Sequence, residues 1–254
     1  MNAARGGAAP AAVAQAHVPL LQPQALVASR LLMGREATAW TLPEQIAVAV
    51  GERILNETIA PGNRIGEEQL AREFRVSRGP IRDALRILEG AGLAVITSRR
   101  GATASTLGAD DLREIFELRH ALLVIAIRGF ARLGAAGDRL LFKRHVLALE
   151  MVPPEPRAAL LYTDALDRVM LFLAHHCGNA RIAHIMTTLS LQSFRYYRRG
   201  QAHSRPDAPR HGEVVRFYQD LVVVFERELS VEPLLARLRR IYTERAGNIG
   251  EFLP

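Results

Sequence analysis

Apolar residues in the first half of the chain recur with two different periods. Three segments place them three or four positions apart, the period of an amphipathic helix: residues 41–58, 66–74 and 77–90. Two later segments are short and flanked by turn-forming residues, as strands are: residues 94–97 and 102–105. Three helices followed by a hairpin predict a winged helix-turn-helix domain over residues 40–106, a fold that places one helix in a DNA groove.

The sequence also marks where these helices begin and end. Ser77 is a good N-cap, because its hydroxyl can accept a hydrogen bond from a backbone N–H that lacks a helical partner. Pro80 suits the first turn of the same helix, where an N–H is not needed. Thr41 and Glu44 have the spacing of a capping box, which predicts another helix start. Only two residues separate the second helix from the third, so we expect a tight turn there.

The helix of residues 77–90 has an apolar face and a separate cationic face. Ile81, Leu85 and Leu88 form the first, and the second is formed by Arg78, Arg82 and Arg86. Arginines with this spacing often form only a solvated surface. Where the positive charge lies in the domain therefore indicates whether these arginines bind DNA. The domain as a whole has a net charge of only +1, whereas residues 75–100 carry +4. The charge is therefore concentrated where a phosphate-facing surface is expected.

Residues 54–106 resemble the N-terminal domain of bacterial transcription regulators of the GntR family. The matching residues are Pro61-Gly62, Glu68-Gln-Leu-Ala71, Val76-Ser-Arg78, Pro80-Ile-Arg82, Ala84-Leu85, Leu88-Glu89, Gly92-Leu93 and Arg100-Gly101. Gly66 and Gly79 depart from the family, which usually has Ser or Thr at both positions. The resemblance implies contacts to operator bases and phosphates, with the wing tip in the minor groove. The predicted DNA-binding residues are Ser77, Arg78, Gly79, Arg82, Arg86, Arg99, Arg100 and Gly101.

The helical period continues from Asp110 to the end of the chain, without strand patterns or a glycine-rich phosphate loop. Six helices are expected, at about residues 110–133, 138–150, 157–177, 179–199, 209–228 and 230–249. The chain is therefore predicted to be mostly α, with an all-α bundle over residues 107–254. Helical bundles hold ligands between their helices. This half resembles the FCD effector and dimerisation domain of the FadR branch, and six helices rather than seven suggest the VanR-like subgroup.

The resemblance implies a divalent metal, often zinc or nickel, held by one Asp and three His. Asp167 and His211 match two of the ligands, but Leu171 and Ile241 stand at the other two positions. Two protein ligands are too few for a tight site. We therefore expect no metal and a metal-free effector pocket, in which Asp167 and His211 form an ion pair or bind a polar group; His184 stays open as a substitute ligand.

Arg119 completes the predicted pocket. It is a charged residue among the apolar Ile115, Leu118, Leu122 and Val124. A buried guanidinium can bind a carboxylate through two hydrogen bonds, or it can form an internal salt bridge. Both readings stay open at this point, and the first favours a carboxylate or acyl compound as the effector.

Composition narrows the class of protein. The 254 residues are 49% hydrophobic, enough for buried cores, and the single Cys177 excludes an intramolecular disulfide and suits a reducing cytoplasm. The longest apolar run, residues 121–127, is too short to span a membrane. Residues 1–39 are rich in alanine and nearly uncharged, so we expect a disordered or partly helical extension.

These observations predict a ligand-responsive transcription regulator, which we favour as a repressor, that binds a palindromic DNA operator as a homodimer. One alternative is a metal-dependent enzyme built on the helical bundle. It is disfavoured because the chain has no His-Glu-x-x-His motif and Cys177 has no evident orienting partner. The other alternative is an architectural DNA-binding protein that has no effector.

Overall fold

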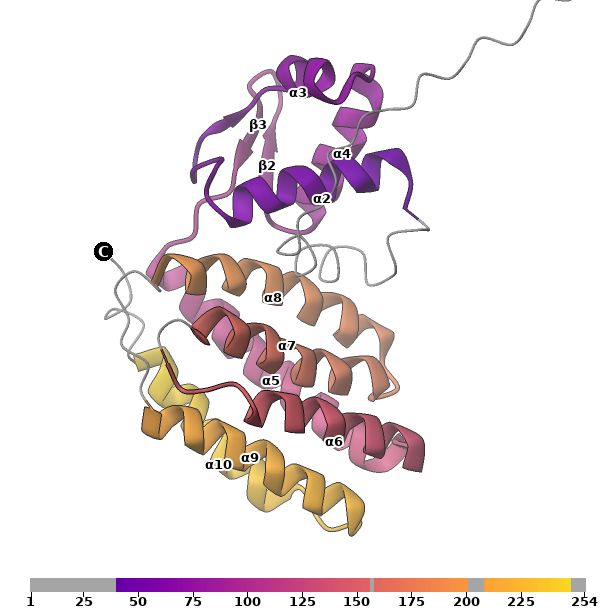
Figure 1. Cartoon of the computed structure of the whole chain (residues 1–254), viewed down its shortest axis with the longest axis vertical. Coiled ribbons are helices and arrows are strands. Elements are labelled where there is room, and N and C mark those ends of the chain that lie inside the picture. The colour runs from indigo at the N-terminus through magenta and orange to yellow at the C-terminus, as the bar shows by residue number, and fades with distance from the viewer. Residues whose placement is uncertain (1–39, 156–157, 201–207, 248–254) are drawn as a thin grey trace, which may run out of the picture.

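The computed structural model describes residues 40–155, 158–200 and 208–247 (Figure 1). The extension predicted for residues 1–39 lies outside this range. A small domain with helices and a sheet sits at one end of the molecule, above a larger bundle of helices. The described part is mostly α-helical, as the sequence predicts.

The N-terminal domain contains three helices and one three-stranded sheet. The helices are α2 (Leu42–Leu55), α3 (Glu67–Phe74) and α4 (Arg78–Gly90), and the strands are β1 (Arg64–Ile65), β2 (Ala94–Thr97) and β3 (Gly101–Ala104). The predicted hairpin is confirmed, because β2 pairs antiparallel with β3, from Ala94 opposite Ala104 to Thr97 opposite Gly101. β1 was not expected. Its two residues pair with the other edge of β3, which gives the order β1-β3-β2.

The core of this domain lies between α2, α4 and the sheet. The predicted inner face of α4 is confirmed, since Ile81, Leu85 and Leu88 are fully buried. Burying a side chain of this size contributes roughly 1.5–3 kcal/mol. At the start of α2, the Glu44 carboxylate accepts the Thr41 backbone N–H at 2.7 Å, as a capping box requires. Ser77 is the N-cap residue of α4, with extended backbone and no side-chain capping bond.

In the described ranges, six helices form the C-terminal bundle, as the sequence predicts. They are α5 (Ala109–Leu133), α6 (Ala136–Glu150), α7 (Ala159–His176), α8 (Ala180–Gly200), α9 (Ala208–Glu226) and α10 (Glu232–Gly247). Aromatic rings fill one end of their core, where Phe130 and Phe142 lie 4.9 Å and 5.3 Å from the Phe225 ring centroid. Gly129 lets α5 approach the end of α7, because a Cβ there would lie 2.4 Å from the Cys177 carbonyl oxygen.

Helix α8 is the part of the bundle that packs against the N-terminal domain, and it lies directly beneath that domain in Figure 1. Leu191 and Phe194 on α8 are buried in the same apolar cluster as the N-terminal core. Gln192 packs against Gly92, where an added Cβ would lie only 1.9 Å from the Gln192 side-chain nitrogen. The DNA-binding-type domain therefore rests on a specific segment of the bundle, residues 191–194.

Candidate nucleic-acid interface

Helix α4 presents three arginines to solvent on the side opposite its apolar face. The exposed fractions of the Arg78, Arg82 and Arg86 side chains are 57%, 60% and 75%. The tight turn before α4 is made by Arg75, which adopts a left-handed backbone with φ +55°. Helix α4 is thus anchored on one face by Ile81 and its apolar neighbours and carries solvent-accessible cations on the other.

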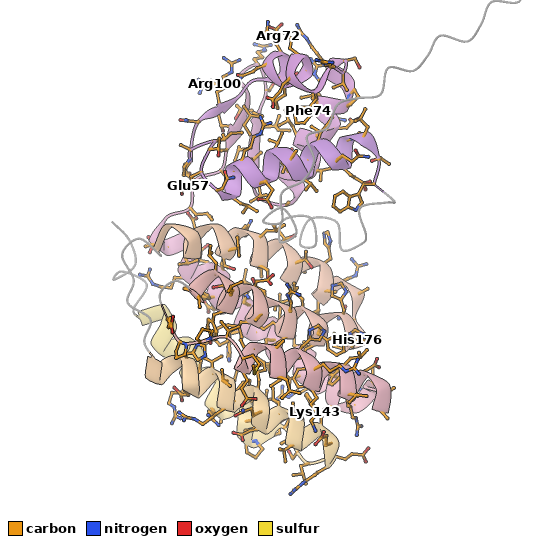
Figure 2. The ribbon with its side chains drawn as sticks, in the orientation of Figure 1. Glu57, Arg72, Phe74, Arg100, Lys143 and His176 are labelled. Carbon is orange, nitrogen blue, oxygen red and sulfur yellow. The ribbon has the colours of Figure 1, made fainter. Side chains whose placement is uncertain are left out.

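The wing places more cations beside this helix. Arg99 lies in the turn between β2 and β3 with φ +65°, a conformation that costs a residue with a side chain roughly 1–2 kcal/mol. Arg100 follows it, and its N–H donates to the Thr97 carbonyl at 3.1 Å. Arg100 and Arg72 both lie at the end of the domain away from the bundle (Figure 2). The wing tip and the last turn of α3, which contains Arg72, therefore extend the cationic surface.

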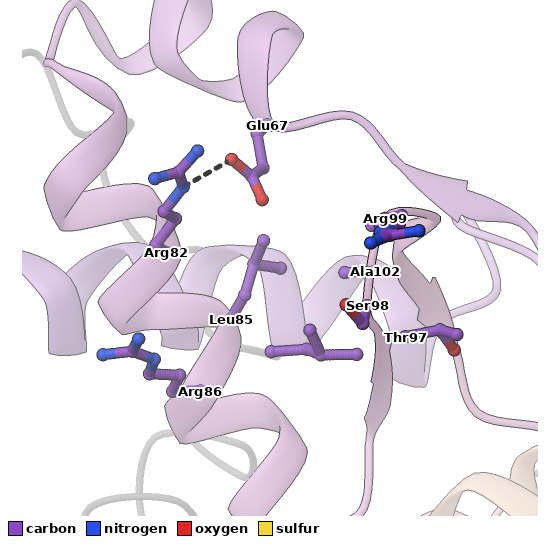
Figure 3. A pocket seen from close by; sticks show the side chains of 10 residues that line it. Glu67, Arg82, Leu85, Arg86, Thr97, Ser98, Arg99 and Ala102 are labelled. Carbon is purple, nitrogen blue, oxygen red and sulfur yellow. Dashed lines mark hydrogen bonds and ion pairs between the residues drawn. The ribbon is translucent and has the colours of Figure 1, made fainter.

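A groove of about 600 Å³ separates α4 from the wing (Figure 3). Its lining residues include Glu67, Arg82, Arg86, Thr97, Ser98 and Arg99. A second groove of about 530 Å³ lies along the start of α3 and includes Arg64, Glu67, Glu68, Arg72 and Arg78. Both grooves have more arginines than carboxylates, which suits them to a polyanion.

Carboxylates pair with all three arginines of α4. Glu67 accepts the Arg82 Nε at 2.9 Å (Figure 3), and Glu68 pairs with the Arg78 Nη2. Asp83 lies 3.7 Å from the Arg86 guanidinium. The sequence analysis missed Glu67 as a member of this surface and used Glu68 only as a family match. The available signal was that both glutamates begin the helix that precedes α4.

The eight predicted DNA-binding residues all lie on one stretch of the N-terminal domain. Ser77 and Gly79 are exposed at the start of α4, the three arginines follow along it, and Arg99, Arg100 and Gly101 form the wing turn. The structure thus brings together two segments, residues 77–86 and 99–101, which are separated in the sequence by the end of α4 and by β2. Their contact with DNA remains a prediction.

A second polar cluster is buried in the bundle. Arg119 on α5 is only 2% exposed, and its two Nη atoms pair with the Asp167 carboxylate and with the Ser193 hydroxyl. The Ser190 hydroxyl also donates to Asp167, at 3.3 Å. Within the described part of the chain, the Arg119 Nε has no hydrogen-bond partner. Of the two roles predicted for Arg119, binding a ligand carboxylate or forming an internal salt bridge, the structure contains the salt bridge.

The electrostatics of this cluster keep its guanidinium charged. Burial by itself would lower the pKa of Arg119, but the Asp167 carboxylate together with the Tyr242 and Tyr218 hydroxyls outweighs burial, and the pKa of Arg119 is raised. Burial raises the pKa of Tyr218 well above its ordinary value and also raises that of Tyr242. The two phenols therefore stay neutral around a single charged pair.

The other predicted pocket residues make different contacts. His211 packs on the Tyr162 ring at 4.4 Å, and burial lowers the pKa of His211. Leu171 is half-buried between the two apolar cores, and Ile241 belongs to the bundle core. Among the described residues, no group of three or more His, Cys, Asp or Glu side chains is placed to hold a metal ion. The structure therefore joins only Arg119 and Asp167 of the five.

No helix in the described ranges is long and apolar enough to cross a membrane.

Comparison with known proteins relates the N-terminal domain to a family of bacterial regulators. The model of the family described as bacterial regulatory proteins, gntR family, matches residues 42–103. An uncharacterised HTH-type transcriptional regulator of Bacillus subtilis, YdhC, is 46% identical over 74 residues, 29% of this chain and 33% of YdhC. The gluconate operon transcriptional repressor of Bacillus licheniformis is 34% identical over 121 residues, 48% of this chain and 46% of the repressor.

The similarity in fold extends through the helical bundle. The structure of McbR/YncC from E. coli superposes with a TM-score of 0.65 at 15% identity, covering 84% of this chain and 98% of that one. The two curated relatives, by contrast, are matched over only a third to a half of their length. Residues 42–103 of this chain are therefore a winged helix-turn-helix domain of the gntR family of bacterial regulatory proteins.

Proposed function

We propose that this chain is a transcription regulator that binds double-stranded DNA through α4 and the wing. The observation that carries the proposal is the single exposed surface on which the α4 arginines and the wing turn meet, within a gntR-family domain. An α-helix fits the major groove, and an arginine can bind guanine O6 and N7 through two hydrogen bonds. The wing arginines would then reach the adjacent backbone or minor groove.

The test is binding of the full chain to duplexes that it selects from a random library. Arg82→Ala should weaken binding to a selected duplex by about 1–3 kcal/mol, the usual cost of losing a base contact. Arg237→Ala removes an arginine of the bundle, paired with Asp220, and serves as a charge-matched control. Fluorescence anisotropy measures both. Equal affinities of Arg82→Ala and the parent protein would refute the assignment of Arg82.

We further propose that the protein acts as a homodimer on a palindromic operator, most simply as a repressor. An exposed apolar stripe on α5 supports this, since Leu118 and Ile125 lie two turns apart and are each about half exposed. Apolar surface of this kind commonly marks a protein–protein contact. Two copies joined through the bundle would present two α4 helices to half-sites related by a two-fold axis.

The helical half is proposed to sense a small carboxylate at Arg119. The support is its buried guanidinium, whose Nε makes no hydrogen bond to a described residue, and its contact with Ser193 on α8. The same turn of α8 carries Leu191 and Phe194 into the N-terminal core. A carboxylate that replaced Asp167 on the guanidinium would therefore disturb the segment on which the DNA-binding domain rests.

A second candidate is a DNA-binding protein without an effector. The observation that favours it is that Asp167 already pairs with Arg119, so the cluster can be purely structural. Native mass spectrometry of the full chain distinguishes a regulator with an effector from a protein without one, and it also measures the number of subunits. A mass of twice 28.0 kDa with a bound small acid would support a dimeric sensor. A bare dimer that no small carboxylate stabilises against heat would favour the second candidate.

A further inference from the structure

Two carboxylates stand at the centre of the proposed DNA interface. Glu67 and Glu68 begin α3, and they pair with Arg82 and Arg78 of α4 across the tight turn. Glu67 lines both grooves that border the recognition helix. Carboxylates repel phosphates, so their place on a surface for a polyanion requires a reason.

Stability is a weak reason for these two pairs. Negative charge in the first turn complements the α3 dipole, and Gly66 offers no capping side chain there. That accounts for acids at the start of α3 but not for their contacts with the arginines of α4. The Arg82 and Arg78 side chains are more than half exposed, and exposed ion pairs contribute little to stability.

The geometry of Arg82 suggests a different role. Glu67 accepts the hydrogen bond of the Arg82 Nε, at 2.9 Å, and neither Nη group has a hydrogen-bond partner among the described residues (Figure 3). Those two groups form the end of the guanidinium that can donate to guanine O6 and N7 together. Because one edge of Arg82 is held, the other edge is oriented before DNA arrives, which lowers the cost of ordering a long side chain on binding.

We propose that Glu67 and Glu68 are specificity-determining residues: both make their arginines poor partners for phosphates, and Glu67 also holds Arg82 for a base contact. The proposal rests on the proposed DNA-binding function. On an unrelated sequence, a phosphate must compete with the carboxylate for the same guanidinium and is repelled by it. On the correct sequence, the base edge adds to the carboxylate contact and does not replace it. Discrimination therefore rises because non-specific binding falls.

The experiment uses the full chain and two labelled duplexes of about 30 base pairs, roughly three helical turns. One has a random sequence, and the other is selected from a random library by the unmodified protein. Glu67→Gln and Glu68→Gln remove each charge with little change of shape. Glu73→Gln is the matched control, because Glu73 lies on the same helix but pairs with Arg53, outside both grooves.

Each groove variant should bind the random duplex more tightly. If one more phosphate is neutralised, the slope of log K against log salt steepens by about 0.9, an extra gain of about threefold between 200 and 50 mM salt. Affinity for the selected duplex should rise less, so the ratio of the two affinities falls. Unfolding curves check that all variants are folded.

The outcomes separate the two proposals. If the unmodified protein binds neither duplex, the proposed DNA-binding function fails. If it binds and selects DNA, but the groove variants match it or gain no more than Glu73→Gln, the role of Glu67 and Glu68 is overturned and the function stands. A selected duplex that loses affinity in Glu67→Gln while the random duplex gains it would support the orienting role of Glu67 most directly.

Discussion

Replacing Arg119 by Met should destabilise the protein strongly. The substitution keeps the length of the side chain but leaves the Asp167 carboxylate buried without its cation, and it also takes a partner from the Ser193 hydroxyl. Breaking a buried pair by removing one member costs about 3–5 kcal/mol. Total stabilities are about 5–15 kcal/mol, so this single change removes a third or more of the stability of an average protein.

The double variant Arg119→Met with Asp167→Leu distinguishes this reasoning from simple damage to the core. With both charges gone, a well-packed apolar pair should restore most of the loss, because replacing a whole buried pair is often neutral. The assay is urea unfolding, followed by circular dichroism for all helices and by the fluorescence of Trp40, the only tryptophan, for the N-terminal domain. A loss below about 1 kcal/mol in Arg119→Met, or a double variant as unstable as the single one, would refute the argument.

Two further predictions concern the domain junction and pH. Gly92→Ala should lower the free energy of unfolding by about 1–2 kcal/mol or more, since φ is +71° and the added Cβ meets Gln192 at 1.9 Å; Gly90→Ala, with open space, should not. Equal stabilities of Gly92→Ala and Gly90→Ala in urea unfolding would contradict a tight contact between Gly92 and Gln192. Burial lowers the pKa of His120, His145, His175 and His211 below the ordinary 6.5. The unfolded chain then binds more protons, so stability should fall as pH drops below about 6.5, and a midpoint in urea that is constant between pH 7.5 and 5.5 would oppose this.

The sequence predicted the parts of the fold that have a local signal. The six bundle helices and the α4 face follow from the spacing of apolar residues, and the hairpin follows from its turn. Strand β1 escaped notice because two residues are too few to show an alternation. Its existence depends on pairing with β3, far along the chain.

The interactions between distant segments were the harder part of the candidate sites. Arg119 was recognised as unusual because it is a charge among apolar residues, but its partner lies 48 positions away. Nothing near Asp167 in the sequence selects Arg119 over His211. The contact of Gln192 with Gly92 has no local signal either, since glycine there is equally explained by the end of α4. Contacts of this kind depend on how the helices pack against one another, and the spacing of apolar residues along the sequence does not determine that packing.

The two arginine sites show why the type of cation matters more than the net charge. Arg82 donates its Nε to Glu67, and its two Nη groups have no partner among the described residues. Arg119 uses both Nη groups inside the bundle, and its Nε is the group without a described partner. A planar guanidinium can hold one partner and still offer a defined edge to a second. A lysine ammonium is a point charge without a fixed edge, so it would replace the charge of Arg82 but not its orientation. At Arg82, therefore, the fixed partner determines which end of the guanidinium stays accessible to a second partner.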